Sequence, residues 1–146
     1  MNLKKPECDL CQIVEPNRRR KEPLWIADLK VSTAFLSENQ ICPGYTYLVY
    51  NKGHATELFQ LATQERQNIM EDITKIAKAI FDAFHPKKMN YELLGNIDPH
   101  LHWHIIPRKT SDPIPLQWPI WGKDYVTVKL SKREYINAIR KIRKKM

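Results

Sequence analysis

The sequence predicts an α+β domain in which helices lie on one face of an antiparallel sheet. Residues 100–105 alternate histidine with apolar side chains, which is the two-residue period of a half-buried strand. Residues 63–84 instead repeat apolar side chains at the spacing of an amphipathic helix. Strand-like segments both precede and follow this helix, and that order is typical of the α+β class. The 146 residues suffice for one sizeable core, so we expect a single domain over residues 1–146.

Three short strands are predicted before the long helix. Residues 1–23 are polar and predict an irregular start of the chain. Apolar segments at 24–27 and 31–36 predict two strands separated by a turn. After a polar connection, the aromatic and β-branched run at 45–50 predicts a third strand.

The long helix is predicted over residues 63–84. Thr63 is a candidate N-cap, and His85 and Pro86 end the helix. The apolar residues that recur at helical spacing are Ile69, Ile73, Ile76, Ala77, Ile80 and Phe84. This stripe predicts which face of the helix packs on the sheet.

The second half of the chain adds two strands and a final helix. Strands are predicted at 89–94 and 101–107, and the turn between them makes them antiparallel neighbours. The proline-rich residues 108–122 are predicted to lie extended over the surface, and residues 125–130 could add a short strand. A capping box predicts that a helix occupies about residues 131–146. Its apolar stripe consists of Tyr135, Ile139 and Ile142.

Three of the five histidines lie on one face of the strand predicted at 101–107. A strand rises about 3.3 Å per residue, so His100, His102 and His104 follow one another at about 6.6 Å. A zinc–nitrogen bond is only about 2.0–2.1 Å long, so one ion could take two neighbouring imidazoles at most. At least one histidine therefore remains free for other chemistry.

The seven residues from His100 to Ile106 resemble the signature of the histidine triad family, His-φ-His-φ-His-φ-φ, where φ is apolar. The flanking residues 89–96 and 118–121 are similar to a bacterial branch described as diadenosine tetraphosphate hydrolase-like. The resemblance covers residues 8–121 and leaves the basic C-terminal helix outside it. It implies a HIT-like fold, with a five-stranded antiparallel sheet and one long helix, commonly paired into a homodimer.

The resemblance implies that His102, the middle histidine, is the catalytic nucleophile. A neutral imidazole attacks through one nitrogen if the other keeps its proton in a hydrogen bond. Attack on an α-phosphorus gives a nucleotidyl-histidine, which water or another acceptor resolves. His104, one strand step away, can donate to a phosphate or leaving-group oxygen as charge develops there. We therefore expect a nucleotidyl hydrolase or transferase that acts on a nucleoside 5′-phosphoanhydride, phosphoester or phosphoramidate, with a substrate like a dinucleoside polyphosphate.

Candidate substrate contacts occur in the sequence both before and after the predicted long helix. Asn96 can hold phosphate oxygens, although it is also an ordinary turn residue. Dinucleoside polyphosphate hydrolases carry Gly-Gln before the motif, whereas this chain has Gly95-Asn96-Ile97-Asp98. The difference bears on which substrate is bound and leaves the histidine chemistry unchanged. The resemblance also implies that Phe35 walls the base and that Ser37 meets the ribose, where relatives carry Asp or Asn. A phenylalanine in a strand is otherwise a core residue.

Cys8 and Cys11 have the spacing of two zinc ligands, with a redox pair as the alternative. A structural zinc needs four ligands, and His54 and His100 are available candidates. The arrangement is similar to that of galactose-1-phosphate uridylyltransferase and of some bacterial histidine triad proteins. This likeness implies that Cys8, Cys11, His54 and His100 bind a structural Zn²⁺. In the alternative interpretation the cysteines are reduced thiols and His54 is a surface residue.

The net charge of +8 is concentrated at one end of the chain. Residues 131–146 hold seven basic residues and one acidic residue, so they contribute six of those charges. A general polyanion-binding domain would spread its basic surface over the fold. We therefore do not expect nucleic acid as the partner, and we predict that the basic face of the final helix is exposed to solvent.

No apolar run of membrane-spanning length and no signal-peptide pattern occurs, so we expect a cytoplasmic protein. Two other functions remain open. The first is a zinc hydrolase in which His100 and His102 bind a catalytic metal. The second is a basic adaptor that binds nucleic acid through its terminal helix.

Overall fold

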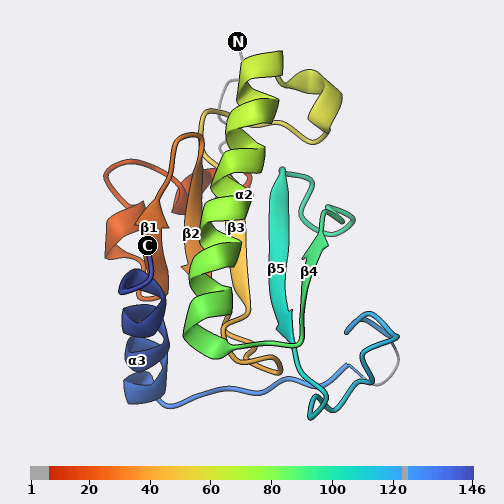
Figure 1. Ribbon diagram of the computed structural model, residues 1–146. Coiled ribbons are helices and arrows are strands. Elements are labelled where there is room, and N and C mark those ends of the chain that lie inside the picture. Colours follow the sequence, from red (N-terminus) through yellow and green to blue (C-terminus); the bar gives the residue numbers. More distant parts are fainter. Residues whose placement is uncertain (1–6, 123–124) are drawn as a thin grey trace.

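The computed structural model describes residues 7–122 and 125–146, and the strands in these ranges form one five-stranded sheet (Figure 1). The strand order is β1-β2-β3-β5-β4, and all neighbours are antiparallel. The strands are β1 (Trp25–Asp28), β2 (Ser32–Leu36), β3 (Thr46–Tyr50), β4 (Lys88–Glu92) and β5 (His102–Arg108). The predicted α+β fold class is therefore confirmed.

Two long helices cover one face of this sheet (Figure 1). They are α2 (Thr63–Phe84) and α3 (Lys132–Arg143), close to the predicted positions. The short helices are α1 (Asp9–Ile13) and the 3₁₀ turns η1 (Arg19–Lys21) and η2 (Leu58–Gln60), whereas the sequence predicted an irregular start. Residues 1–6 of that start lie outside the described residues. None of the helices in the described ranges combines the length and apolar character needed to cross a bilayer.

The predicted N-cap of α2 is wrong by one residue. Thr63 is already helical, and Ala62 has the extended conformation of a cap. The backbone N–H of Ala62 donates to Oε2 of Glu65 at 3.0 Å. Since Glu65 satisfies this terminal group, the helix begins without a hydroxyl cap.

Residues 125–130 do not form the predicted strand. Val128 accepts one backbone hydrogen bond from Gln40 at 2.8 Å, and its own N–H donates to Oδ1 of Asn39 at 2.8 Å. Gln40 and Asn39 belong to a connection rather than a strand. Among the described residues, these contacts are single hydrogen bonds to a connection and not the repeated backbone pairing of a strand ladder.

The main core lies between the sheet and the two helices. Leu101, Trp103 and Ile105 pack in it, as the predicted alternation requires. The helical residues of the same core include Ile69, Ile73, Ile76 and Ile80 of α2 with Ile139 and Ile142 of α3. His100, His102 and His104 consequently project from the opposite face of the sheet, away from the helices.

α3 is docked on the fold rather than free in solvent. Ile139 and Ile142 are buried, as predicted from the apolar stripe. Arg143 donates to the backbone carbonyls of Ile26 and Trp25 at 2.8 and 2.7 Å, and its guanidinium lies over the Trp25 ring. Arg143 therefore belongs to the contact with β1, whereas Nζ of Lys141 lies 5.9 Å from the centroid of the Phe84 ring at the end of α2.

Candidate functional site

Strand register places four side chains in one row across the histidine face of the sheet. Phe35 of β2 pairs with Tyr47 of β3, Tyr47 pairs with His104 of β5, and His104 pairs with Glu92 of β4. His102 lies two residues before His104 on β5, opposite Val49. Paired residues in adjacent strands point to the same side, so these groups share one surface.

His102 is oriented by the backbone two residues before it, just ahead of β5. Its Nδ1 lies 2.7 Å from the carbonyl oxygen of His100. A carbonyl oxygen can only accept, so Nδ1 of the neutral ring carries the proton and Nε2 keeps its lone pair. The ring is only 7% exposed, at the base of a cavity. This is the state that a nucleophilic imidazole requires.

His104 is held by Tyr45, whose hydroxyl oxygen lies 2.7 Å from Nδ1 of the imidazole. Burial, with a smaller contribution from His102, lowers the pKa of His104 to about 4. Burial raises the pKa of Tyr45, so both groups of this pair are neutral near pH 7. Gly44 precedes Tyr45 with φ +96°, and a Cβ there would lie 2.6 Å from the Phe84 ring, so this turn needs glycine.

The two histidines open into a cavity of about 290 Å³. Tyr47 and Trp121 form two of its walls, and the loop of residues 94–98 forms another. The structure thus brings the predicted Asn96 to the same cavity as His102 and His104. The rings of His102 and His104 have their centroids 5.0 Å apart, a separation at which both can reach one phosphate.

A second cavity, of about 470 Å³, adjoins the first and contains the predicted Phe35 and Ser37. Tyr47 lines both cavities. Ser37 is buried, and its hydroxyl oxygen accepts from the N–H of Asn39 at 3.1 Å. Phe35 is also buried, at 5% exposure. This burial agrees equally with a core residue and with a residue that forms the cavity wall.

Sequence reasoning did not assign a role to Tyr45, Glu92 or Trp121. Glu92 accepts a hydrogen bond from the indole N–H of Trp121, and the Trp121 ring lies 4.9 Å from the His104 ring, centroid to centroid. Tyr45, which follows Pro43-Gly44, shows nothing in the sequence that predicts a contact with a histidine. The Trp118-Pro119-Ile120-Trp121 stretch carries only the family likeness in the sequence and no signal for a contact with His104.

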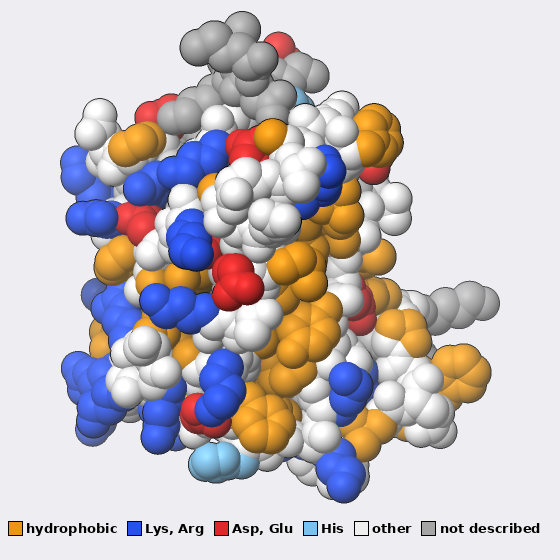
Figure 2. Space-filling model, turned by 45° about the horizontal axis from the view of Figure 1, so that its top comes forward, with side chains coloured by type: hydrophobic (Ala, Val, Ile, Leu, Met, Phe, Trp, Pro, Cys, Tyr) orange, Lys and Arg blue, Asp and Glu red, His pale blue; other side chains and the backbone are white. Residues whose placement is uncertain are grey.

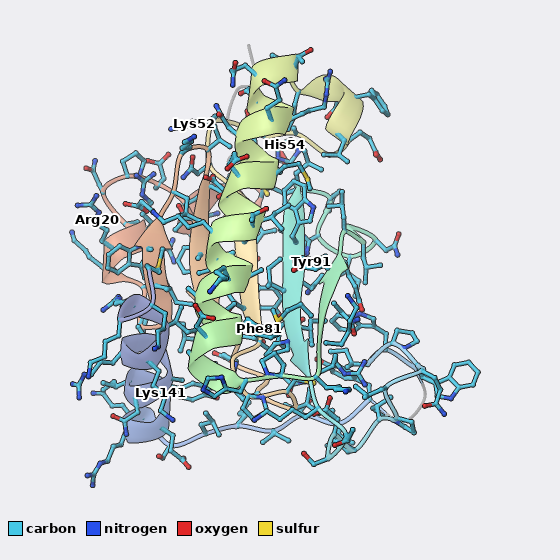
Figure 3. All side chains as sticks on the ribbon, in the orientation of Figure 1. Arg20, Lys52, His54, Phe81, Tyr91 and Lys141 are labelled. Carbon is cyan, nitrogen blue, oxygen red and sulfur yellow. The ribbon has the colours of Figure 1, made fainter. Side chains whose placement is uncertain are left out.

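The four predicted metal ligands converge at the end of the sheet where β5 begins, and Figure 3 shows His54 there. The Sγ atoms of Cys8 and Cys11 lie 3.5 and 3.4 Å from Nδ1 of His100. Cys11 Sγ is also 3.4 Å from Nδ1 of His54, and the four candidate ligand atoms all lie within 4.8 Å of one another. Bond lengths of about 2.3 Å to sulfur and about 2.0 Å to nitrogen predict sulfur–nitrogen separations of about 3.6 Å around a tetrahedral zinc.

The hydrogen bonding of His100 fits a metal ligand. Its Nε2 lies 2.8 Å from the carbonyl oxygen of Tyr50, so the proton is on Nε2 and the Nδ1 lone pair faces the sulfurs. On the cysteine side, Cys8 is the N-cap of α1 and its sulfur accepts from the N–H of Cys11 at 3.4 Å. The donor set and its spacing therefore suit a metal ion.

Comparison with known proteins agrees with this architecture. The family model described as HIT domain matches residues 19–111. "Protein hit" of Bacillus subtilis is 33% identical over 98 residues, which cover 63% of this chain and 67% of that protein. The adenosine 5′-monophosphoramidase hnt1 of Schizosaccharomyces pombe is 26% identical over 114 residues, which cover 77% of this chain and 83% of the relative. The asymmetrical bis(5′-nucleosyl)-tetraphosphatase of the same yeast is 28% identical over 88 residues, which cover 57% of this chain but only 48% of the relative.

Solved structures show the same fold. A histidine triad protein from Bradyrhizobium japonicum aligns with a TM-score of 0.76 and 30% identity, covering 87% of this chain and 93% of that one. A Zn-bound histidine triad family protein from Mycobacterium smegmatis aligns with a TM-score of 0.65 and 16% identity, covering 94% of both chains. With the family model matching more than half of its length, this chain belongs to the HIT domain family.

Proposed function

We propose that this HIT enzyme cleaves a nucleoside 5′-phosphoanhydride, phosphoester or phosphoramidate through a nucleotidyl group carried on His102. The observation that carries the proposal is the 2.7 Å hydrogen bond from Nδ1 of His102 to the His100 carbonyl. It leaves the Nε2 lone pair in a cavity that also holds His104 and Asn96. The two yeast relatives support the reaction class, since their names describe cleavage of a nucleosyl tetraphosphate and of a nucleoside phosphoramidate.

In the first step, Nε2 of His102 forms a bond to the α-phosphorus and the bond to the leaving group breaks. The leaving group departs with the electron pair of that bond. In the second step, water attacks the same phosphorus, the P–N bond breaks, and the nucleoside monophosphate is released with loss of the water proton. The backbone carbonyl of His100 accepts the hydrogen bond from Nδ1–H throughout both steps. It thereby stabilises the positive charge that the His102 ring gains on attack.

His104 acts as a neutral donor on the leaving side. We infer that the Tyr45 hydroxyl, 2.7 Å from Nδ1, donates to this nitrogen. The imidazole proton is then on Nε2, where it can point to a leaving-group or phosphate oxygen. Such a fixed donor in a buried site stabilises the negative charge that develops there. Asn96 adds a side-chain amide to the same cavity, and the cavity beside Phe35 takes the nucleoside.

A structural zinc completes the proposal. Cys8, Cys11, His54 and His100 would hold it, and a closed set of four protein ligands has no open position for a substrate or a catalytic water. The ion would cross-link the N-terminal segment to the start of β5. Support comes from the sulfur–nitrogen distances and from the zinc-bound mycobacterial relative.

The geometry favours this reaction over the two other functions considered. Among the described residues, the group of converging ligand atoms includes His100 and not His102, so His102 is available as a nucleophile rather than as a partner for a catalytic hydroxide. The basic α3 lies on the helix-covered face, whereas the histidines face the opposite side. Nucleic acid bound to α3 would therefore be remote from the triad.

We further propose that the enzyme is a homodimer joined along β4 and α2. An apolar groove of about 630 Å³ runs between these elements, and its lining includes Met70, Phe81 and Tyr91, which are all exposed. Figure 2 shows apolar side chains gathered along this side of α2, and Figure 3 shows Phe81 and Tyr91 on it. β4 is an edge strand of the sheet, so a second copy would cover both its free edge and the groove.

The covalent step predicts that brief mixing with an α-phosphate-labelled nucleotide labels the protein. A P–N bond to histidine is stable in alkali and labile in acid, so the label should survive a base quench and be lost in acid. His102→Ala should hold no label and should turn over at least about a thousandfold more slowly. His104→Ala should still become labelled, but slowly. Retention of label by the His102→Ala protein would exclude His102 as the nucleophile.

The lowered pKa of His104 predicts that its ring stays neutral down to about pH 4. Between pH 6.5 and 4 this histidine is protonated in the unfolded chain but not in the folded chain. The free energy of unfolding therefore decreases as the pH is lowered through this range, by up to about 1.4 kcal/mol per pH unit. Above pH 6.5 it has no such effect. An NMR titration should give a midpoint near 4, and His104→Gln should flatten the pH dependence of urea unfolding. A midpoint near 6.5 would contradict the buried environment described here.

The zinc proposal predicts about one zinc per chain in protein purified without chelator. Cys11→Ala should lose the metal and unfold at lower temperature, because a structural site contributes its binding energy to folding. Cys42→Ala is the matched control, since Cys42 is also buried but lies outside the ligand group, and it should retain zinc. Elemental analysis and thermal unfolding measure both effects. Metal-free protein with an unchanged Tm would refute the proposal.

A further inference from the structure

The cavity beside Phe35 is bounded on one side by a segment that lies outside the family domain. This segment, residues 125–130, is here called the strap, and its residues Thr127 and Lys129 line the cavity. The HIT domain match ends at residue 111, well before the strap. We propose that the strap forms a wall of the nucleoside site and that Asn39 is the positioning residue that holds it there. The inference rests on the proposed function, which puts the nucleoside in this cavity.

The strap presents alternate residues to the cavity. Thr127 and Lys129 are among the lining residues, whereas Val126 and Val128 are not. Val126 and Val128 are instead held by their backbone. The carbonyl of Val126 accepts from Nδ2 of Asn39 at 3.0 Å, and the N–H of Val128 donates to Oδ1 of the same amide at 2.8 Å. One side-chain amide therefore fixes both backbone neighbours of Thr127.

Asn39 is buried, and every hydrogen-bonding group of its amide is used. Its Nδ2 also donates to the hydroxyl oxygen of Tyr125 at 2.6 Å, and its Oδ1 also accepts from the N–H of Ile41 at 3.1 Å. An amide has two N–H donors and two oxygen lone pairs, so no group remains for a ligand. Loss of this side chain would leave buried backbone groups unpaired, which is costly. Asn39 thus acts on the strap and not on the substrate.

A second contact fastens the far end of the strap. The hydroxyl of Tyr135, on α3, accepts from the N–H of Leu130 at 3.1 Å and donates to the carbonyl of Glu38 at 2.7 Å. Between the two ends, the N–H of Gln40 donates to the carbonyl of Val128 at 2.8 Å. The strap is thus tied to the connection after β2 along its length. Because these bonds form without a ligand, the wall does not have to be ordered when a nucleoside binds.

The strap supplies a hydroxyl that the end of β2 cannot offer. Ser37 is completely buried, and its hydroxyl oxygen accepts from the N–H of Asn39 at 3.1 Å. Thr127 is exposed, and its hydroxyl makes no hydrogen bond within the part of the chain that the structure describes. A hydroxyl can both donate and accept, which suits the polar edges of a sugar or a base. We therefore assign the hydrogen bond to the nucleoside to Thr127 and not to Ser37.

The charges around this cavity suit an uncharged ligand. Its charged lining residues are Glu22, Glu38 and Lys129. Lys129 lies 3.7 Å from Glu38, and Glu22 pairs with Arg18 at 2.8 Å. The described lining residues therefore offer no surplus of positive charge to a phosphate chain, whereas a nucleoside needs none. The strap can thus act on nucleoside recognition separately from the chemistry in the histidine cavity.

The test measures binding of two ligands by calorimetry. Adenosine 5′-monophosphate is a product of the proposed reaction, and pyrophosphate has no nucleoside. Thr127→Ala should weaken binding of the monophosphate about fivefold, as expected for one lost hydrogen bond, and Thr127→Ser should restore most of it. Val126→Ala is the matched control, because this neighbouring side chain does not line the cavity, and it should change neither affinity. Pyrophosphate should bind equally well to all these proteins.

Asn39→Ala tests the positioning role and should weaken binding of the monophosphate about tenfold, since it releases the wall that carries Thr127. Asn51→Ala removes another buried asparagine amide, directly after β3, and should lower Tm without changing that affinity. Unchanged monophosphate binding by Thr127→Ala, or a lowered Tm with unchanged binding in Asn39→Ala, would overturn the inference even if His102 becomes labelled. The predicted losses of affinity with no label on His102 would support the strap and contradict the proposed reaction.

Discussion

Two hydrogen bonds to backbone carbonyls give opposite tautomers to His100, just before β5, and His102, the first residue of β5. His100 donates through Nε2 to Tyr50, and His102 donates through Nδ1 to His100 itself. The first bond leaves Nδ1 facing two cysteine sulfurs, and the second leaves Nε2 facing the cavity. Identical side chains two residues apart thereby face a group of candidate metal ligands and a cavity, respectively. The division depends on the start of β5 lying beside the end of β3, where the N–H of Tyr50 also donates to the Leu101 carbonyl.

The remaining groups are arranged around that strand according to sheet register. The alternation of β5 puts Trp103 and Ile105 into the core with α2, so the core fixes the strand from one side while the histidine side chains project from the other. Tyr47, His104 and Glu92 lie in one row because antiparallel pairing aligns them. Glu92 then holds Trp121, and Tyr45 holds His104. A shift of register by one residue would bury the opposite set of side chains. It would separate the candidate metal ligands and remove His102 and His104 from their cavity.

Much of this arrangement could be predicted because it is periodic or local in sequence. The alternation at residues 100–105 predicted β5 and its buried face, and helical spacing predicted α2. The family likeness supplied the ligand set that the structure brings together. Tyr45 was missed because its contact with His104 joins residues 59 apart and follows a glycine turn packed on Phe84. The role of Arg108 was missed because its hydrogen bonds to the carbonyls of Trp118 and Ile114 are made within a folded loop, which no local pattern reveals.

The central claim is that the backbone sets which nitrogen of each histidine carries the proton, and ¹⁵N NMR of the imidazole rings measures this directly. At a pH where the rings are neutral, the account predicts that His102 is protonated at Nδ1 and that His100 is protonated at Nε2. Assignment of the His102 proton to Nε2 would leave no lone pair facing the cavity. That result would contradict the account, because neither nucleophilic attack by His102 nor its separation from the metal site would then follow from the fold.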